Sequence, residues 1–349
     1  MIALLLACTS AARDRVEPSF IEVHLAAPES AGAKATPLPF TSVASSLGLS
    51  ISTLDVKGGA YPFDGTLSVE VRPGRITDST RVTVEDGVWS GTVQIEAAFG
   101  PTRIWAKDED VDDDRIPSWS AGVSETIWYN QPTISEMQAT DNHETNQLAG
   151  EYSELRVEDR QVVVTATDTA GFWVADLLDA PGNYAGLYAY TFQKPDDEVV
   201  VGARLTLLTG LNQEYLASTQ LSFPTLAVAE GEALEPPAAF EVTDAVCGDD
   251  NEMEKYEGAR VVATLPVIPS TFTTDSTAYA DFLDYGSWPL TVGSCEMYVE
   301  SSLSAPDFYP PDHVGETLGI VEGMLKEVYG AWTFVILDTS GIDDPNHPE

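Results

Sequence analysis

The chain has 349 residues, and its 56 acidic and 17 basic side chains give a formal net charge of −39 at pH 7. A surface this negative repels phosphate backbones and anionic headgroups, which excludes nucleic acids and anionic membrane surfaces as expected partners. Because 43% of the residues are hydrophobic, the chain can build roughly two or three domain cores and does not have the composition of a disordered protein.

The N-terminal segment MIALLLAC places a cysteine directly after a short apolar run. It resembles the lipobox of bacterial lipoproteins, in which the cysteine, here Cys8, is acylated and anchors the protein stably through two or three acyl chains. The resemblance implies that residues 1–16 are a signal and tether. It also implies an exported protein that reaches its membrane partner through the lipid. Thr9, rather than an aspartate, follows the cysteine, as in lipoproteins of the outer membrane or cell surface.

Two alternatives to this interpretation stay open. The apolar run is shorter than that of an ordinary secretory signal, and no basic residue precedes it. The start of the protein could therefore lie upstream, or Cys8 could be a chance cysteine in an apolar terminus. No other segment approaches the length of a transmembrane helix.

Residues 17–110 alternate apolar and polar side chains over short runs, as in 67–72, 82–85 and 93–97. This period predicts strands with one buried face, and the Gly-rich turns between them favour a β-sandwich. The stretch 89–106 resembles the last two strands of bacterial Ig-like domains, so we expect an Ig-like β-sandwich here.

An acidic run follows, and 111–150 is expected to be an acidic and extended linker. Asp108, Asp110 and Asp112 have the alternating spacing of ligands in calcium loops, which makes them a candidate Ca²⁺ site. However, Asp113 stands where such a loop needs glycine, and Trp119 stands where it needs a carboxylate. A solvated acidic loop is the alternative.

Residues 151–228 contain β-branched and aromatic runs, among them VVVTAT (162–167), GFWVAD (171–176) and GLYAY (186–190). Their order resembles the OB-fold modules that accompany secreted bacterial nucleases, which implies a first OB-like barrel. Trp173, Tyr188 and Tyr190 are candidates for stacking on a ligand. Core or hairpin packing is the favoured interpretation of these rings, and stacking is the alternative. Since few basic residues accompany them, a neutral sugar is expected before a nucleic acid.

Residues 235–349 repeat features of the preceding module, which predicts a second OB-like barrel. The stretch 201–205 is echoed by 314–318, and Gly210 is echoed by Gly323. Cys247 and Cys295 both fall in this region and are expected to form a disulfide in an oxidising compartment. Two buried free thiols are the alternative.

The expected fold is therefore all-β, an Ig-like sandwich followed by two OB-like barrels. No hydrolase, metalloprotease, P-loop or dinucleotide-binding motif occurs, so we expect no enzyme and no cofactor other than Ca²⁺ at the acidic run. The expected function is that of a non-catalytic cell-surface lipoprotein with a structural or protein-binding role. The alternative is an accessory OB module that binds a carbohydrate or a nucleotide.

Overall fold

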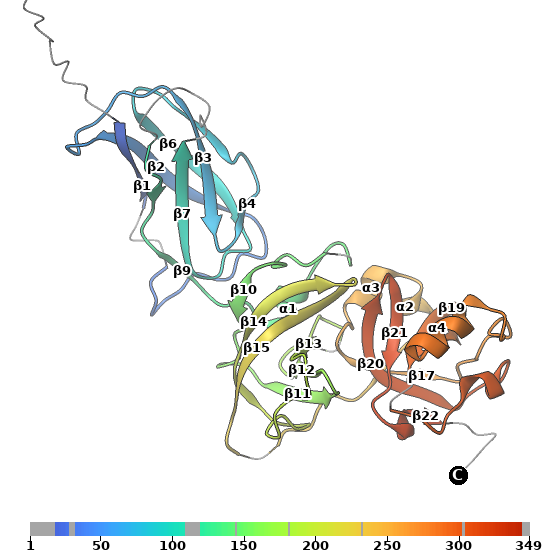
Figure 1. The fold of residues 1–349 in the computed structure, drawn as a ribbon. Helices are drawn as coiled ribbons and strands as arrows, with labels where there is room; N and C mark the ends of the chain where they lie inside the picture. The colour runs from blue at the N-terminus through green and yellow to red at the C-terminus, as the bar shows by residue number, and fades with distance from the viewer. Residues whose placement is uncertain are drawn as a thin grey trace, which may run out of the picture. The chain divides into compact units, whose positions relative to one another are not determined.

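The computed structural model describes residues 18–27, 32–108, 119–143, 145–180, 182–231, 233–301 and 304–343. The chain divides into two compact units, unit 1 (Met1–Asn130) and unit 2 (Gln131–Glu349). Both are built mainly of strands (Figure 1), which confirms the predicted all-β class. Among the described helices, none is both long and apolar enough to cross a membrane.

Unit 1 packs two sheets against each other. One has the order β1-β2-β6-β4, and the other has the order β5-β3-β7-β8 with β9 added to β7. The apolar residues of the alternating runs, such as Leu67, Val69 and Ile95, are buried in one core shared by both sheets. The strands are β1 (Pro18–Leu25), β2 (Ser45–Asp55), β3 (Gly65–Arg72), β4 (Arg75–Ile76), β5 (Arg81–Val84), β6 (Val88–Glu96), β7 (Gly100–Asp108), β8 (Gly122–Val123) and β9 (Ile127–Tyr129).

Within the described residues 119–143, the structure differs from the extended linker expected over 111–150. Strands β8 and β9 pair with β7 and belong to unit 1, where Ile127 is fully buried. Helix α1 (Ile134–Gln138) follows, and Thr133 and Glu136 form a reciprocal capping box at its start. These elements are too short to produce a periodic apolar pattern, so the sequence alone does not reveal them.

The first sheet of unit 2 has the order β10-β14-β15-β13-β12-β11. β13 and β15 run parallel, and a bridge between Val163 and Arg204 joins β11 to the residue preceding β14, so the sheet curls back on itself. The strands are β10 (Tyr152–Glu154), β11 (Val162–Thr167), β12 (Gly171–Asp176), β13 (Gly186–Tyr190), β14 (Leu205–Tyr215) and β15 (Ser218–Val228).

The second sheet of unit 2 has the order β16-β17-β20-β21-β19-β18 with β22 added to β20. Its part β20-β21-β19-β18 repeats the arrangement β14-β15-β13-β12 of the first sheet, including the parallel pair, here β19 and β21. The predicted duplication has a backbone basis, since Gly202 and Gly315 both have φ near +80° (+85° and +83°), a conformation that favours glycine. The strands are β16 (Phe240–Glu241), β17 (Arg260–Thr264), β18 (Ser287–Val292), β19 (Cys295–Glu300), β20 (Ile320–Val328), β21 (Ala331–Val335) and β22 (Ile342–Asp343). The helices are α2 (Asp244–Cys247), α3 (Asp250–Glu254), α4 (Thr277–Tyr285), η2 (Pro310–His313) and η3 (Thr339–Gly341).

The predicted disulfide between Cys247 and Cys295 is confirmed, with a Cα–Cα distance of 6.0 Å. It ties the end of α2 to the start of β19. The two sheets of unit 2 also share a small apolar core, in which Met324 of β20 packs with Trp173 and Tyr188. We call the sheet of β10–β15 the first module and the sheet of β16–β22 the second module. The surface along which the two modules meet, which includes this apolar core, is called the seam.

Candidate ligand-binding groove

The groove begins with Trp173 on β12 and Tyr188 and Tyr190 on β13. Trp173 is the cross-strand partner of Tyr188, and Tyr190 lies two residues further along β13 on the same face. The ring centroids of Trp173 and Tyr188 are 4.6 Å apart, and those of Tyr188 and Tyr190 are 6.4 Å apart. The structure thus brings these three rings together, and Trp173 and Tyr188 are buried in the apolar core that they share with Met324, as the core-packing interpretation expected.

Two further rings, which the sequence analysis missed, extend this row to the surface. Phe192 lies 4.3 Å from Tyr190 and 4.6 Å from Phe223, measured between centroids. Phe192 is 54% exposed and Phe223 is 60% exposed. Both have positive φ, 64° and 55°. This backbone conformation is strained for bulky residues and recurs at functional sites.

The aromatic row lines a groove of about 530 Å³. Its polar lining comes from both modules of unit 2: Asp168, Gln213 and Gln220 from the first, and Glu300 and Lys326 from the second. The Lys326 ammonium lies 5.5 Å from the centroid of Tyr188. Trp173 is buried, and within the described residues its Nε1 has no hydrogen-bond partner, which is uncommon for a buried donor.

The ionisable groups of the groove are restrained by their neighbours. The Tyr188 hydroxyl donates to Asp168 Oδ2 at 3.1 Å, and burial together with this carboxylate raises the pKa of Tyr188. Asp168 also accepts from the backbone N–H groups of Ala170 and Gly171. Burial raises the pKa of Glu300, whereas the positive charge of Lys326 lowers it. The groove therefore offers aromatic faces with hydrogen-bonding groups between them.

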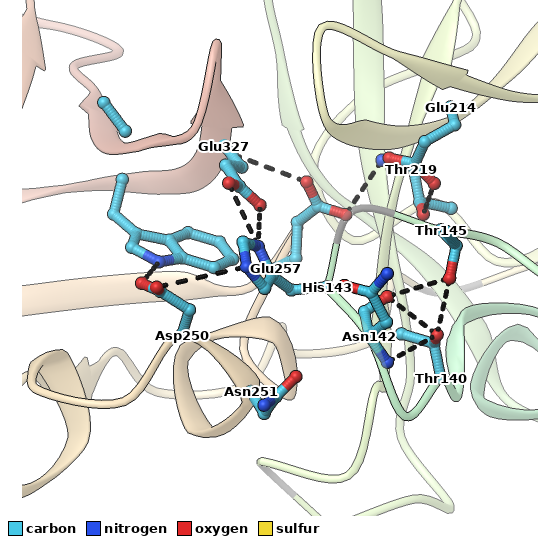
Figure 2. Close-up of polar contacts among 12 residues, drawn as sticks. Thr140, Asn142, His143, Thr145, Glu214, Thr219, Asp250, Asn251, Glu257 and Glu327 are labelled. Atoms are coloured by element: carbon cyan, nitrogen blue, oxygen red, sulfur yellow. Dashed lines mark hydrogen bonds and ion pairs between the residues drawn. The ribbon is translucent and has the colours of Figure 1, made fainter.

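A second polar feature, here called the acid cluster, lies at the same seam and consists of Glu214, Glu254, Glu257 and Glu327. His143 joins it, since its Nδ1 lies 3.0 Å from Glu327 Oε2. His143 Nε2 is 4.0 Å from Asp250. Figure 2 shows His143 next to the fully buried Glu327 and close to Asp250.

Glu257 is the central member of the acid cluster. Its carboxylate accepts from the backbone N–H of Thr219 at 3.0 Å and from that of Glu327 at 3.4 Å (Figure 2). The Thr219 hydroxyl in turn donates to Glu214 at 2.9 Å. Since Thr219 lies on β15 and Glu327 on β20, Glu257 links the two sheets of unit 2.

Burial is the first cause of the raised pKa values in the acid cluster. It raises the pKa of Glu214 to about 7. Burial also raises the pKa values of Glu254 and Glu257, with a further contribution from neighbouring carboxylates. A carboxyl in a low-dielectric site holds its proton because the charged form loses its hydration.

The other residues singled out in the sequence have different outcomes. Cys8, Asp110 and Asp112 lie outside the described residues, and Asp108 ends β7. In the described part of the chain, one set of side chains lies close enough together to hold a metal ion: Asp244, Cys247 and Cys295. Both of these thiols are consumed by the disulfide. The Ca²⁺ site at the acidic run stays a prediction.

No protein-family model matches the chain, and neither a curated protein nor a solved structure matches it.

The sequence carried some signal for the groove and almost none for the acid cluster. Period-2 spacing in GLYAY predicts that Tyr188 and Tyr190 share a face. By contrast, His143 and Glu327 are 184 residues apart. With 56 acidic side chains in the chain, nothing local distinguishes the glutamates that folding buries.

Proposed function

We propose that the chain is an exported, non-catalytic binding protein whose unit 2 holds a neutral carbohydrate in the aromatic groove. The observation that carries this proposal is the row from Trp173 to Phe223, which ends in exposed phenyl rings on strained backbone. Aromatic faces pack against the apolar faces of sugars, while amide and carboxyl groups bond their hydroxyls.

The fold supports a binding role. We propose that unit 1 is an Ig-like sandwich and that each sheet of unit 2 is an OB-like barrel, because β14-β15-β13-β12 and β20-β21-β19-β18 share one arrangement with a parallel pair. OB folds bind oligosaccharides and oligonucleotides on the face of their second and third strands and on the loop between the fourth and fifth. In the first module these elements are β12, β13 and the β14–β15 turn, which contribute Trp173, Tyr188 and Tyr215 to the groove.

Charge favours a sugar over a nucleic acid as the ligand. The groove contributes one lysine against two carboxylates, on a chain with a net charge of −39. Phosphate backbones are repelled by such a surface, whereas neutral sugars are not. Asp168 is engaged by Tyr188 and by two backbone N–H groups, which suits a fixed binding group better than a proton carrier.

The N-terminal segment bears on where in the cell the protein is located. We propose that Cys8 carries a lipid and holds the protein at the outer membrane or cell surface, where unit 2 would meet glycans. A structural or protein-binding role for unit 1 is compatible with this arrangement.

The test is calorimetric titration of the full chain with neutral hexasaccharides of glucose, mannose, xylose and N-acetylglucosamine. We expect at least one to bind, and Phe192→Ala and Phe223→Ala each to weaken it roughly tenfold, since a lost ring contact of about 1.4 kcal/mol changes affinity by that factor. Tyr285→Ala is the matched control, because Tyr285 is 72% exposed on α4 and does not line the groove. Tight binding of single-stranded DNA instead of any sugar would contradict the proposal.

A further inference from the structure

The groove and the acid cluster draw on adjacent residues of the same strands. Gln213 of β14 lines the groove and Glu214 joins the cluster. On β15, Gln220 lines the groove and the Thr219 hydroxyl donates to Glu214 of the cluster. The same pairing recurs on β20 with Lys326 and Glu327. Successive side chains of a strand point to opposite faces, so the two sites are opposite sides of one seam.

We propose that the acid cluster is a proton-controlled latch that holds the two modules of unit 2 together and thereby sets the affinity of the groove for its ligand. This inference rests on the proposed binding function of the groove.

The latch is built from polar contacts that cross the seam. Glu257, from the turn before β17, accepts the backbone N–H of Thr219 in the first module. The turn after β20 makes a second crossing, from Tyr329 N–H to the Leu216 carbonyl at 2.8 Å. A third runs from Tyr184 N–H to the Lys255 carbonyl at 3.0 Å. Separation of the modules would break these contacts together.

The groups that face the latch come from every element packed around it. They are Glu214 from β14, Glu254 from α3, Glu257 from the following turn, Glu327 from β20, His143 between Glu327 and Asp250, and Tyr184, which interacts with Glu254, Glu252 and Lys255. Carboxyls therefore outnumber the neighbouring cationic groups. Within the described residues Glu254 Oε2 and Glu214 Oε1 are buried without a hydrogen-bond partner.

The cluster can remain buried when its glutamate side chains are protonated. A neutral carboxyl can lie in a dry seam, whereas a carboxylate there needs a cation, hydrogen bonds or water. Loss of protons leaves mutually repelling anions in the seam, and separation of the modules lets water reach them. The raised pKa values agree with this direction, since the closed form binds protons more strongly than the open form.

Opening the latch would dismantle the groove. Trp173 and Tyr188 belong to one module, while Lys326, Glu300 and Val335 belong to the other. Ligand affinity should therefore be highest under mildly acidic conditions, where the cluster keeps its protons. It should fall as the pH rises from about 4.5, the ordinary pKa of glutamate, through the pKa of about 7 of Glu214 and beyond.

Two readouts test the latch in the full chain at about pH 6 and about pH 9. The first is amide hydrogen exchange of the peptides that contain Thr219 and Glu327, corrected for the intrinsic pH dependence, because both N–H groups bind Glu257. The second is titration with cellohexaose as a neutral probe of the groove. We expect corrected exchange to accelerate at least about tenfold, and the cellohexaose Kd to rise about tenfold, between these pH values.

Glu254→Gln is the diagnostic variant, because an amide imitates the neutral carboxyl and cannot be deprotonated. It should make both pH responses measurably smaller without abolishing them, because Glu214 and Glu257 still titrate in this range. Glu214→Gln is a second variant in case the first folds poorly. Glu158→Gln makes the same charge change at an exposed position of unit 2 and should behave as the wild type.

The possible failures are distinguishable. The latch would be overturned if corrected exchange of the wild type did not depend on pH. It would also be overturned if the exchange of Glu254→Gln responded to pH as strongly as that of Glu158→Gln. Both conclusions hold whether or not cellohexaose binds. If exchange responds as expected but neither cellohexaose nor any of the other three hexasaccharides binds at either pH, the carbohydrate function is refuted and the latch stands as a device of the fold. A hexasaccharide that binds with the same Kd at both pH values would refute the coupling.

Discussion

At the scale of single residues, the exposed rings of the groove impose a cost on the fold. Phe192 and Phe223 hold left-handed backbone conformations, which disfavour large side chains because Cβ crowds the neighbouring carbonyl. Asparagine adopts a positive φ more readily than phenylalanine does, so it would make the fold more stable at these two positions. The two phenylalanines at these positions agree with the proposed role of their rings in ligand binding.

Replacement of Phe223 by asparagine should therefore separate stability from binding. We expect Phe223→Asn to raise the free energy of unfolding by about 0.5–1 kcal/mol through relief of strain, and to weaken hexasaccharide binding through loss of the ring. Chemical denaturation and calorimetry measure the two effects. Phe223→Ala is the control, since it removes the ring without a preference for positive φ. Equal stabilisation by both variants would contradict the strain argument.

The groove could be predicted from sequence only where its residues belong to regular strands. Trp173, Tyr188 and Tyr190 follow from the strand pattern and the register it implies. Phe192 and Phe223 depend on backbone turns that no local pattern specifies. Lys326 reaches the groove only through the docking of one module on the other, which is a tertiary event.

At the scale of elements, the disulfide fastens α2 to the β18–β19 hairpin. The helix has four residues, far fewer than an isolated helix needs for stability in water. Its position therefore depends on the covalent link and on Asp244, which accepts from the Ser294 N–H at 2.6 Å.

Removal of the disulfide should destabilise unit 2 substantially. The bridge closes a sequence separation of 48 residues, for which the chain-entropy model gives about 4 kcal/mol. We expect the double variant Cys247→Ser/Cys295→Ser to lower the unfolding free energy of unit 2 by a value of that order, and to leave unit 1 unchanged. Thiol titration of the denatured, unreduced wild type supplies the control. Reactive thiols at both positions would contradict the bridge.

The sequence was informative for strands and less so for short helices. Alternation revealed β3, β5 and β6, and the apolar runs revealed β11 to β13. Helix α4 lay in a region expected to be only β, although its signals were present: Ser276 caps the Tyr279 N–H, and Gly286 ends the helix with φ +73°. Strong strand patterns on both sides outweighed them in the interpretation.

For the whole molecule, the two units should respond differently to pH. In unit 2, burial raises the pKa values of Glu214, Glu254 and Glu257 and so favours their neutral forms. Such groups stabilise fully below their unfolded pKa, and the contribution is lost as the pH rises through the folded value, from about 4.5 to about 7 for Glu214. Glu254 and Glu257 extend the loss to higher pH.

Unit 1 has shifts mainly of the opposite sign. Hydrogen bonds from Gly59 and Lys57 N–H groups lower the pKa of Asp55, and Lys107 lowers that of Glu70. These contributions are present above the unfolded pKa and are lost only as the pH falls through the folded one. His24, whose pKa Glu125 raises, opposes them, but its side chain is 53% exposed, and exposed pairs contribute little.

Scanning calorimetry of the full chain should therefore resolve two transitions that diverge with pH. Between about pH 5 and about pH 9, the melting temperature of unit 2 should fall while that of unit 1 stays nearly level. A reductant identifies the unit 2 transition, because Cys247 and Cys295 both lie there. A unit 2 transition that rises towards pH 9 would contradict the assignment of buried neutral carboxyls.

The shared strands of the groove and the acid cluster constrain how this protein could vary. If a single residue were inserted or deleted in β20 ahead of Lys326, every later side chain of that strand would change face, so an acid would confront the bound molecule and a lysine would enter the dry seam. Substitutions on one side leave the other intact, whereas length changes damage both at once. Related chains that retain both sites should therefore differ here by replacement and keep the spacing of this strand unchanged.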